Sequence, residues 1–357
     1  MKKILIQFIF TLFCCSFLLL LLFYSDKCIS LASNGLLIWY KNMIPSLFPF
    51  MVLSGFMVRS GLSLKIGQWL QPVLGLFFRL PSQMLYAIFM GFLCGFPMGA
   101  KIVADMLEKE QITLKEGEYL LAFCNNIGPL YMLGYIIPLF GYENIGKILG
   151  LMYLIPLGYG LGLRYFSPMY SSLFHSKGNK KEKSSVFPTL KTSLNVQKNN
   201  PHTLHACSAP KNNHTFPNYP IFFQQSLSSA IEQITLLGGC MIFFNCLLIF
   251  PEILRTYLPQ TLFTPDHSPI LSAILCSLIE IGGGLRQLAH TPLIETNTTT
   301  FSIFVPLSLL TFGGLSCITQ TCFILKNTGL KISTYIKHKL IQSCIFIIIM
   351  SLFFYHI

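Results

Sequence analysis

The chain has 357 residues, of which 53% are hydrophobic and only 11% are charged, and its mean hydropathy is +0.61. Soluble domains carry about 25% charged residues, so this composition excludes an ordinary soluble protein and predicts several transmembrane helices. The net charge of +12 does not indicate nucleic acid as a partner, because the cations lie mostly in loops and at the ends of apolar runs, as the positive-inside bias and anionic lipid headgroups require.

The apolar runs, taken in chain order, predict an all-α polytopic membrane protein of about 8–10 helices in a cell membrane. The first run, residues 4–24, follows two lysines, but no convincing small-x-small cleavage site comes after it, so we interpret it as an uncleaved span. The short run 66–79 is expected to lie in the interface or to re-enter. The other runs are 36–58, 84–106, 119–140, 145–166, 221–250, 269–290, 301–325 and 340–356.

Residues 167–220 differ in composition from the rest of the chain. They hold seven lysines, four histidines and a single acid, Glu182, without periodicity, so we expect a flexible, cytoplasmic loop. The histidines are irregularly spaced, which favours a solvated loop over a metal site. Most of the twelve cysteines lie in apolar runs and none forms a C-x-x-C pair, so we expect no disulfide framework, metal or cofactor.

Two halves that resemble each other flank this loop. Gly55 and Gly238 are 183 residues apart, Gly95 and Glu280 are 185 apart, and Asn126 and Gly313 are 187 apart. The near-constant offset predicts two copies of one unit, in either parallel or inverted orientation. We therefore divide the chain into an N-terminal anchor helix with its loop (1–34), a first gate-like repeat (35–166), the basic loop (167–220), and a second gate-like repeat with a C-terminal helix (221–357).

Each half contains apolar segments that glycine or proline interrupts beside polar residues. Broken helices at corresponding places in two halves are the best sequence indication of a transport-type site. The predicted breaks are at Gly95, Pro97, Gly99, Pro129, Gly283, Gly313 and Gly314. The predicted substrate-binding residues are Asn125, Asn126, Glu280, Ser316 and Gln320.

Each of these polar groups also has a structural interpretation. Glu280 would be costly inside a bilayer, so it either contacts a substrate or cation, or pairs with Arg286 or Lys101. Asn125 and Asn126 either bind a polar solute or cap backbone groups freed by the break. Lys101 and Asp105, four residues apart, are expected to pair with each other. Ser316 and Gln320 either complete a polar cavity or join helices.

No enzyme signature is present: we find no P-loop, no G-x-S-x-G and no H-E-x-x-H, and we assign no catalytic residue. We therefore expect a protein that is not an enzyme. A membrane enzyme acting on a lipid-linked cell-wall precursor is the weakest of three hypotheses. The leading one is a gate-type protein that passes a small polar solute or cation, and the second is a non-transporting scaffold or assembly factor.

Four segments resemble the sporulation integral membrane protein YlbJ family, which is part of a wider group with gate or nucleoside-recognition domains. They are G-F-L-C-G-F-P-M-G-A-K-I-V-A-D (91–105), the F-C-N-N-I-G-P block, the Glu280 segment and T-F-G-G-L-S-C-I-T-Q (311–320). The resemblance covers most of 35–345. It implies a multi-pass protein of a sporulation-stage membrane in an endospore-forming bacterium, needed for spore cortex formation. The partners that we expect are the lipid bilayer, a small polar solute or cation, and a membrane protein or a second copy of the chain. Cys317-Ile318-Thr319 and the long central loop depart from the family pattern and leave the solute open.

Overall fold

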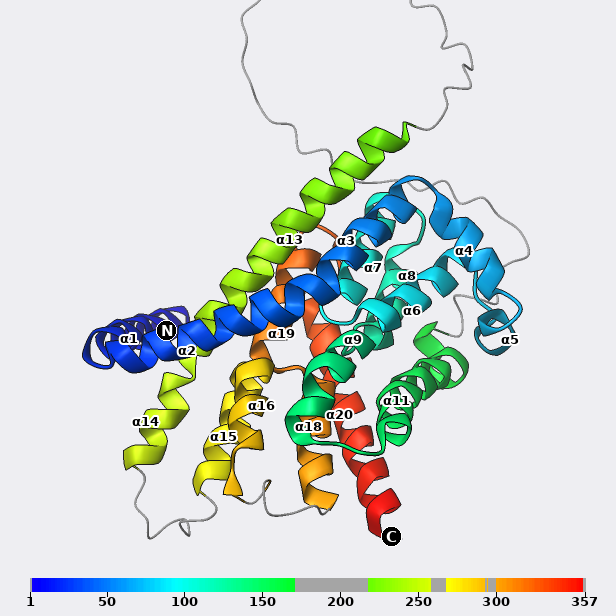
Figure 1. Ribbon diagram of the computed structural model, residues 1–357. Coiled ribbons are helices and arrows are strands. Elements are labelled where there is room, and N and C mark those ends of the chain that lie inside the picture. The colour runs from blue at the N-terminus through cyan, green and yellow to red at the C-terminus, as the bar shows by residue number, and fades with distance from the viewer. Residues whose placement is uncertain (1, 171–217, 258–267, 293, 295–299, 356–357) are drawn as a thin grey trace, which may run out of the picture.

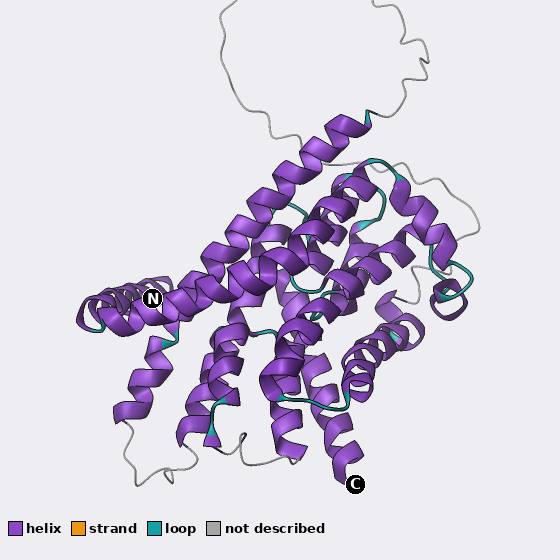
Figure 2. Cartoon of the chain, viewed as in Figure 1, coloured by secondary structure: helices purple, strands orange, loops and turns teal. Residues whose placement is uncertain are grey.

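The computed structural model describes residues 2–170, 218–257, 268–292, 294 and 300–355. This part of the chain consists of helices and loops without a strand (Figure 2). Seven of its helices are long and apolar enough to cross a membrane. The predicted all-α, multi-pass membrane protein is therefore confirmed. Most of the predicted basic loop, including its four histidines, lies outside the described residues.

The N-terminal part forms two helical segments. The first is α1 (Lys2–Phe23), and the second is a continuous 35-residue stretch made of α2 (Ser25–Ile38), η1 (Trp39–Met43) and α3 (Ile44–Arg59). Phe13 and Phe17 of α1 stack on Phe250 with ring centroids 5.3 and 5.9 Å apart. Most other large apolar side chains of α1 are exposed, as expected for a helix that faces lipid.

A first series of helices follows the N-terminal part. The nine residues of α4 and the five of α5 are too short to cross a bilayer, in line with the expectation for residues 66–79. Next come a helical hairpin, a helix broken in its middle, and a long helix (Figure 1). The bounds are α4 (Leu62–Leu70), α5 (Leu74–Phe78), α6 (Ser82–Cys94), α7 (Met98–Glu108), α8 (Leu114–Cys124), α9 (Pro129–Tyr131), η2 (Met132–Ile136), α10 (Ile137–Phe140) and α11 (Ile145–Phe166).

With the long helix α2–α3 placed before it, and apart from the short helices α4, α5 and α14, the first series has the same order as a second one: a long helix, a hairpin, a broken helix and a long helix. The bounds of the second series are α13 (Tyr219–Leu247), α14 (Ile249–Tyr257), α15 (Ser268–Ile279), α16 (Ile281–Ala289), α18 (Thr300–Phe312), α19 (Gly314–Leu325) and α20 (Ile332–Tyr355). Helix α20 begins eight residues before the predicted run at 340, because its first two turns carry Tyr335 and Lys339 into the interior. The interpretation of the series as two copies of one unit stays a prediction, and this shared order supports it.

The equivalent long helices of the two series run in opposite directions. Gly35 lies beside Asn245, the Trp39 indole packs on Gly238 and donates to the Ile234 carbonyl (2.9 Å), and Gly55 lies beside Ser226. As the chain advances along α2–α3, its partner positions move backwards along α13. The two helices are therefore antiparallel, and if the two series are copies of one unit, this packing makes the second copy inverted.

Two backbone positions require glycine at the breaks. Gly95 ends α6 with φ +83°, and Gly313 precedes α19 with φ +86°, a region that side chains disfavour. A side chain at Gly95 would also overlap the backbone of Gly128. The tip of the α6–α7 hairpin can therefore approach the break in α8–α9 closely, and this contact positions the site described next.

Candidate functional site

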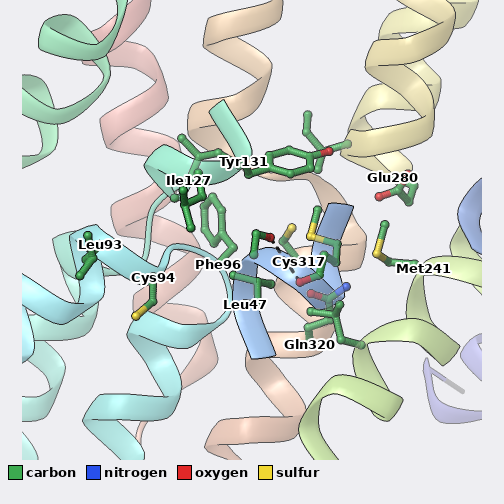
Figure 3. A pocket seen from close by; sticks show the side chains of 16 residues that line it. Leu47, Leu93, Cys94, Phe96, Ile127, Tyr131, Met241, Glu280, Cys317 and Gln320 are labelled. Atoms are coloured by element: carbon green, nitrogen blue, oxygen red, sulfur yellow. Dashed lines mark hydrogen bonds between the residues drawn. The ribbon is translucent and has the colours of Figure 1, made fainter. Parts of the chain in front are cut away.

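A small cavity lies where the interrupted helices meet (Figure 3). Its volume is about 40 Å³, enough for roughly three water molecules. Three breaks contribute to its wall, through Phe96 at the α6–α7 tip, Ile127 and Gly128 between α8 and α9, and Glu280 between α15 and α16. The fourth break touches it indirectly, because Gly313 lies against the Phe96 ring. The wall is mainly apolar; its polar side chains are those of Ser46, Tyr131, Glu280 and Gln320.

Glu280 is the charged residue of the cavity wall, and it is 2% exposed. Its backbone is extended, and its carboxylate caps the start of α16 by accepting from the N–H groups of Gly282 (3.1 Å) and Gly283 (2.5 Å). The Asn245 amide of α13 donates a third hydrogen bond, at 3.1 Å. The carboxylate is thus fixed in position by donors, while no cationic side chain within the described part of the chain lies within 4.0 Å of it.

The two pairing alternatives for Glu280 do not occur. The Arg286 guanidinium donates to the Asn34 side-chain oxygen at 3.0 Å on the exposed side of α16. Lys101 forms a salt bridge with Asp105, as expected from their spacing. Glu280 therefore has neither of the cationic partners that the sequence suggested.

Two tyrosines that the sequence analysis did not select face the Glu280 segment. The Tyr135 hydroxyl donates to the Gly282 carbonyl at 3.2 Å. The Tyr131 hydroxyl is buried, belongs to the cavity wall and has no hydrogen-bond partner among the described residues. In Figure 3 it points towards Glu280. The Y-M-L-G-Y spacing, which places both rings on one helical face directly after a break, could have indicated them.

Asn125 points away from the cavity and is fully buried. Its amide nitrogen donates to the Thr321 hydroxyl (3.2 Å) and the Tyr335 hydroxyl (3.0 Å), and its oxygen accepts from the Ala100 N–H (3.3 Å). These contacts join α7, α19 and α20 at the break. This geometry fits the structural interpretation, in which the Asn125 amide forms its hydrogen bonds with other groups inside the protein.

Asn126 also lies outside the cavity wall. Its amide nitrogen donates to the Phe123 carbonyl at the end of α8 (2.5 Å), and its oxygen accepts from the Lys339 ammonium (2.8 Å). Lys339 is fully buried within α20 and was missed, because it precedes the apolar run 340–356 and resembles a flanking cation. The stripe formed by Tyr335, Lys339 and Gln342, spaced four and three residues apart, could have revealed it.

The residues predicted on α19 separate into two environments. Gln320 reaches the cavity wall, whereas Ser316 is fully buried behind it. The Gln320 amide donates to the Ser316 hydroxyl at 3.1 Å, so the pair is connected along the helix face as its spacing suggested. Of the five predicted substrate-binding residues, Glu280 and Gln320 contact the cavity, and Asn125, Asn126 and Ser316 support the surrounding helices.

The predicted breaks differ in detail from those observed. Gly95, Pro97 and Gly313 lie at interruptions, Gly314 starts α19 with φ +76°, and Pro129 starts α9. Two predicted positions need correction. Gly99 lies within α7 and Gly283 within α16, because their helices begin before them. These glycines provide close packing: a side chain at Gly99 would overlap the Cys124 carbonyl, and one at Gly283 the Asn245 amide.

Comparison with known proteins finds a relative of this chain. The chain is 24% identical over 322 residues to sporulation integral membrane protein YlbJ of Bacillus subtilis (strain 168), which covers 87% of this chain and 74% of that protein. No family model matches the chain, and no solved structure matches it. Within the described residues, no group of three or more His, Cys, Asp or Glu side chains could hold a metal ion. The chain is therefore similar along nearly its whole length to a sporulation integral membrane protein, and its seven candidate membrane-spanning helices agree with a multi-pass membrane protein.

Proposed function

We propose that this protein acts in a sporulation membrane by passing a small polar solute or cation through the cavity between its helix breaks, and that spore cortex formation depends on this activity. The observation that carries the proposal is the buried Glu280 carboxylate, fixed by three donors at a cavity wall without a cationic neighbour in the described structure. Intramembrane acids in such positions typically belong to ion or substrate pathways. The name of the relative YlbJ supports the sporulation setting.

The chemistry of the wall favours a solute that carries a positive charge or hydrogen-bond donors. A carboxylate in an apolar surrounding attracts such groups strongly, since water does not screen it. The Tyr131 hydroxyl and the Gln320 amide offer additional polar contacts on the same cavity. Because the cavity holds only roughly three water molecules, a solute as large as a nucleoside requires the two hairpins to separate. Since no P-loop was found in the sequence, an ion gradient or a partner would supply the driving force.

A specific observation favours the second function, a scaffold or assembly factor. Asn125 and Asn126 make their hydrogen bonds inside the protein, and Ser316 bonds to Gln320. Polar groups that are satisfied in this way join helices without any need for a solute.

Uptake into proteoliposomes tests the proposal. The protein and its Glu280→Gln variant would be reconstituted and screened with nucleosides, monovalent and divalent cations, and cell-wall precursors. Gln keeps an acceptor for the Gly282 N–H but removes the charge, so we expect at least one solute to enter with the unmodified protein and a tenfold or greater loss with Glu280→Gln. Glu232→Gln, at an exposed position on α13, is the matched control and should retain uptake.

Two results would contradict the proposal. The first is an absence of uptake of every solute class by correctly folded protein. The second is equal uptake by Glu280→Gln and by the unmodified chain. In cells, normal cortex formation with Glu280→Gln at normal protein level would favour the scaffold. Turnover of a lipid-linked precursor by purified protein would instead favour the enzyme hypothesis.

A further inference from the structure

Another buried ionisable side chain of the bundle is that of Lys339. Its side chain is 0% exposed and lies two turns inside the membrane-spanning helix α20. No carboxylate in the described part of the chain comes within 4.0 Å of it. A buried, unpaired ammonium is expensive in a membrane protein, and such residues are retained where their charge is used.

The groups around this ammonium are those that a free cation would select. The side-chain oxygens of Asn126 and Gln342 accept from it at 2.8 and 3.3 Å, and the Phe96 ring centroid lies 4.6 Å away. Amide oxygens and the face of an aromatic ring both attract cations. The neighbouring His338 is engaged elsewhere, with Tyr159 (2.6 Å) and Tyr170 (3.4 Å).

The backbone of α8 determines which way the two amides face. The helix stops at Cys124, so its last carbonyls have no partner in a following turn. Gln342 donates to the Ala122 carbonyl at 2.8 Å, and Asn126 donates to the Phe123 carbonyl at 2.5 Å. Each amide nitrogen is therefore committed to the end of α8, and each amide oxygen is turned towards Lys339. The end of a helix also carries partial negative charge, which favours a cation at this place.

We propose that the break after α8 is a monovalent-cation site and that Lys339 is the tethered cation that fills it. In transporters with broken helices, C-terminal ends of half-helices and unwound backbone bind free coupling ions. Here the chain supplies the charge itself, so no free cation is needed at this position. The inference does not depend on the proposed function, because it concerns how the break is held together and can be measured without any solute passing.

Removal of the Lys339 side chain should convert the internal site into one that takes a small free cation. The experiment uses the full chain, purified in detergent, and follows thermal unfolding of the unmodified protein, Lys339→Ala, Lys339→Met and Lys337→Ala. Lys337 is exposed on the same helix and serves as the matched control. Methylammonium chloride is the titrant, and choline chloride at equal ionic strength controls for salt.

We expect Lys339→Ala to lower Tm by roughly 4 °C or more, and methylammonium to restore at least half of that loss with saturation. Choline should restore nothing, because its head group is too large for the space left by the lysine. The unmodified protein, Lys337→Ala and Lys339→Met should show no shift specific to methylammonium. An unchanged Tm in Lys339→Ala, or a loss that methylammonium does not restore, would overturn the proposal.

Lys339→Met keeps the test decisive if Lys339→Ala cannot be purified in any salt. Methionine fills the volume but leaves both amide oxygens facing an apolar chain, so the proposal requires a Tm below that of the unmodified protein. A lysine retained for packing alone would give a Lys339→Met variant of equal or higher Tm, because apolar residues often replace buried charges without loss. That result would overturn the proposal.

Discussion

Glu280 and Lys339 are an acid and a base inside one bundle that do not form a pair. Each is surrounded by neutral hydrogen-bonding groups: backbone N–H and an amide for the acid, amide oxygens and an aromatic ring for the base. Such surroundings fix the position of a charge but do not cancel it. The acid faces the cavity, whereas the base lies behind the Phe96 ring, which forms part of the cavity wall. The acid is therefore placed to contact a solute in the cavity, whereas the base is placed to hold the helices behind it.

Asn245 is expected to hold the Glu280 carboxylate in place. Its amide donates both to that carboxylate and to the Met241 carbonyl, from a position that is 1% exposed. Replacement by Ala removes a donor from a buried charged group, so we expect Asn245→Ala to lower the free energy of unfolding by about 1–3 kcal/mol. Thermal or denaturant unfolding of purified protein measures this change. Thr235→Ala, which removes an exposed hydroxyl on the same helix, is the control and should change little; equal losses in both variants would contradict the assignment.

The sequence alone revealed Glu280 because an acid inside an apolar run has few explanations. It did not reveal Asn245 or Lys339. Asn245 lies in the apolar run 221–250, and its role depends on a residue 35 positions away, which no local pattern reports. Lys339 follows Lys331 and Lys337 and so resembles one of the cations that flank an apolar run. Its side chain points inward because α20 already begins at Ile332, which the sequence did not reveal. Long-range pairing and helix start points are set by tertiary packing, which explains why these two residues required the structure.

At the scale of elements, the α15–α16 hairpin relies on backbone contact between its arms. A side chain at Gly284 would overlap the backbone of Ser277 in the opposite arm. Close contact of this kind lets the turn at Glu280 remain short and keeps the carboxylate at the cavity wall. Small residues at helix contacts serve the same purpose in membrane bundles generally.

Gly284→Ala should therefore force the arms of the second hairpin apart. We expect a loss of about 1–3 kcal/mol in the free energy of unfolding, because the obstructing atoms belong to the backbone and cannot rotate away. Gly158→Ala, on the exposed side of α11 with no atom within 4 Å of the new methyl group, should be neutral or stabilising by roughly 0.5–1 kcal/mol. Unfolding curves of both variants in one detergent provide the measurement. A Gly284→Ala variant as stable as Gly158→Ala would contradict the backbone contact.

The sequence predicted the existence of the broken elements better than the location of each break. Residues 269–290 were expected to be interrupted at Gly283, but α15 already ends at Ile279. The reason is that Glu280 can cap α16 with its own side chain, which makes the residue before the glycines the favourable turning point. Glycines indicate where two helices can approach closely or where a helix can bend, whereas the capping residue determines where the new helix begins.

At the scale of the whole molecule, the loops gather on two opposite faces. The first face holds the end of α3, the loop 109–113 and the loop 326–331: Gln111 donates to the Val58 carbonyl at 3.2 Å, and Gly329 lies beside Leu114. The second face holds the loop 141–144 and the start of α18, since the Tyr142 hydroxyl donates to the Ser302 carbonyl at 2.9 Å. In Figure 1 these faces are at the top and the bottom.

The distribution of basic residues predicts that the first face is cytoplasmic. It carries six basic residues, together with the acids of residues 108–118: Arg59, Lys65, Lys109, Lys115, Lys326 and Lys331. Tyr219, where the chain leaves the lysine-rich segment, lies beside Phe56 near the end of α3. On the second face, Lys147 and Arg255 are accompanied by the acids Glu143 and Glu252. Because the excess of Lys and Arg in short loops sets orientation, we expect residues 326–331 inside the cell and residues 141–144 outside.

Labelling of single cysteines with a membrane-impermeant maleimide tests this orientation in a bacterial plasma membrane. Glu143→Cys and Lys326→Cys would be introduced into a chain whose native cysteines are replaced by serine, and that parent chain is the background control. We expect Glu143→Cys to react in intact cells and Lys326→Cys to react only after permeabilisation. Three membrane passages, through α11, α13–α14 and α18–α19, lie between these two positions, and an odd number of passages places them on opposite sides of the membrane. Labelling of both positions from the same side would contradict the inverted arrangement of the two series, whereas labelling with the sides exchanged would leave the inversion intact and refute only the assignment of the cytoplasmic face.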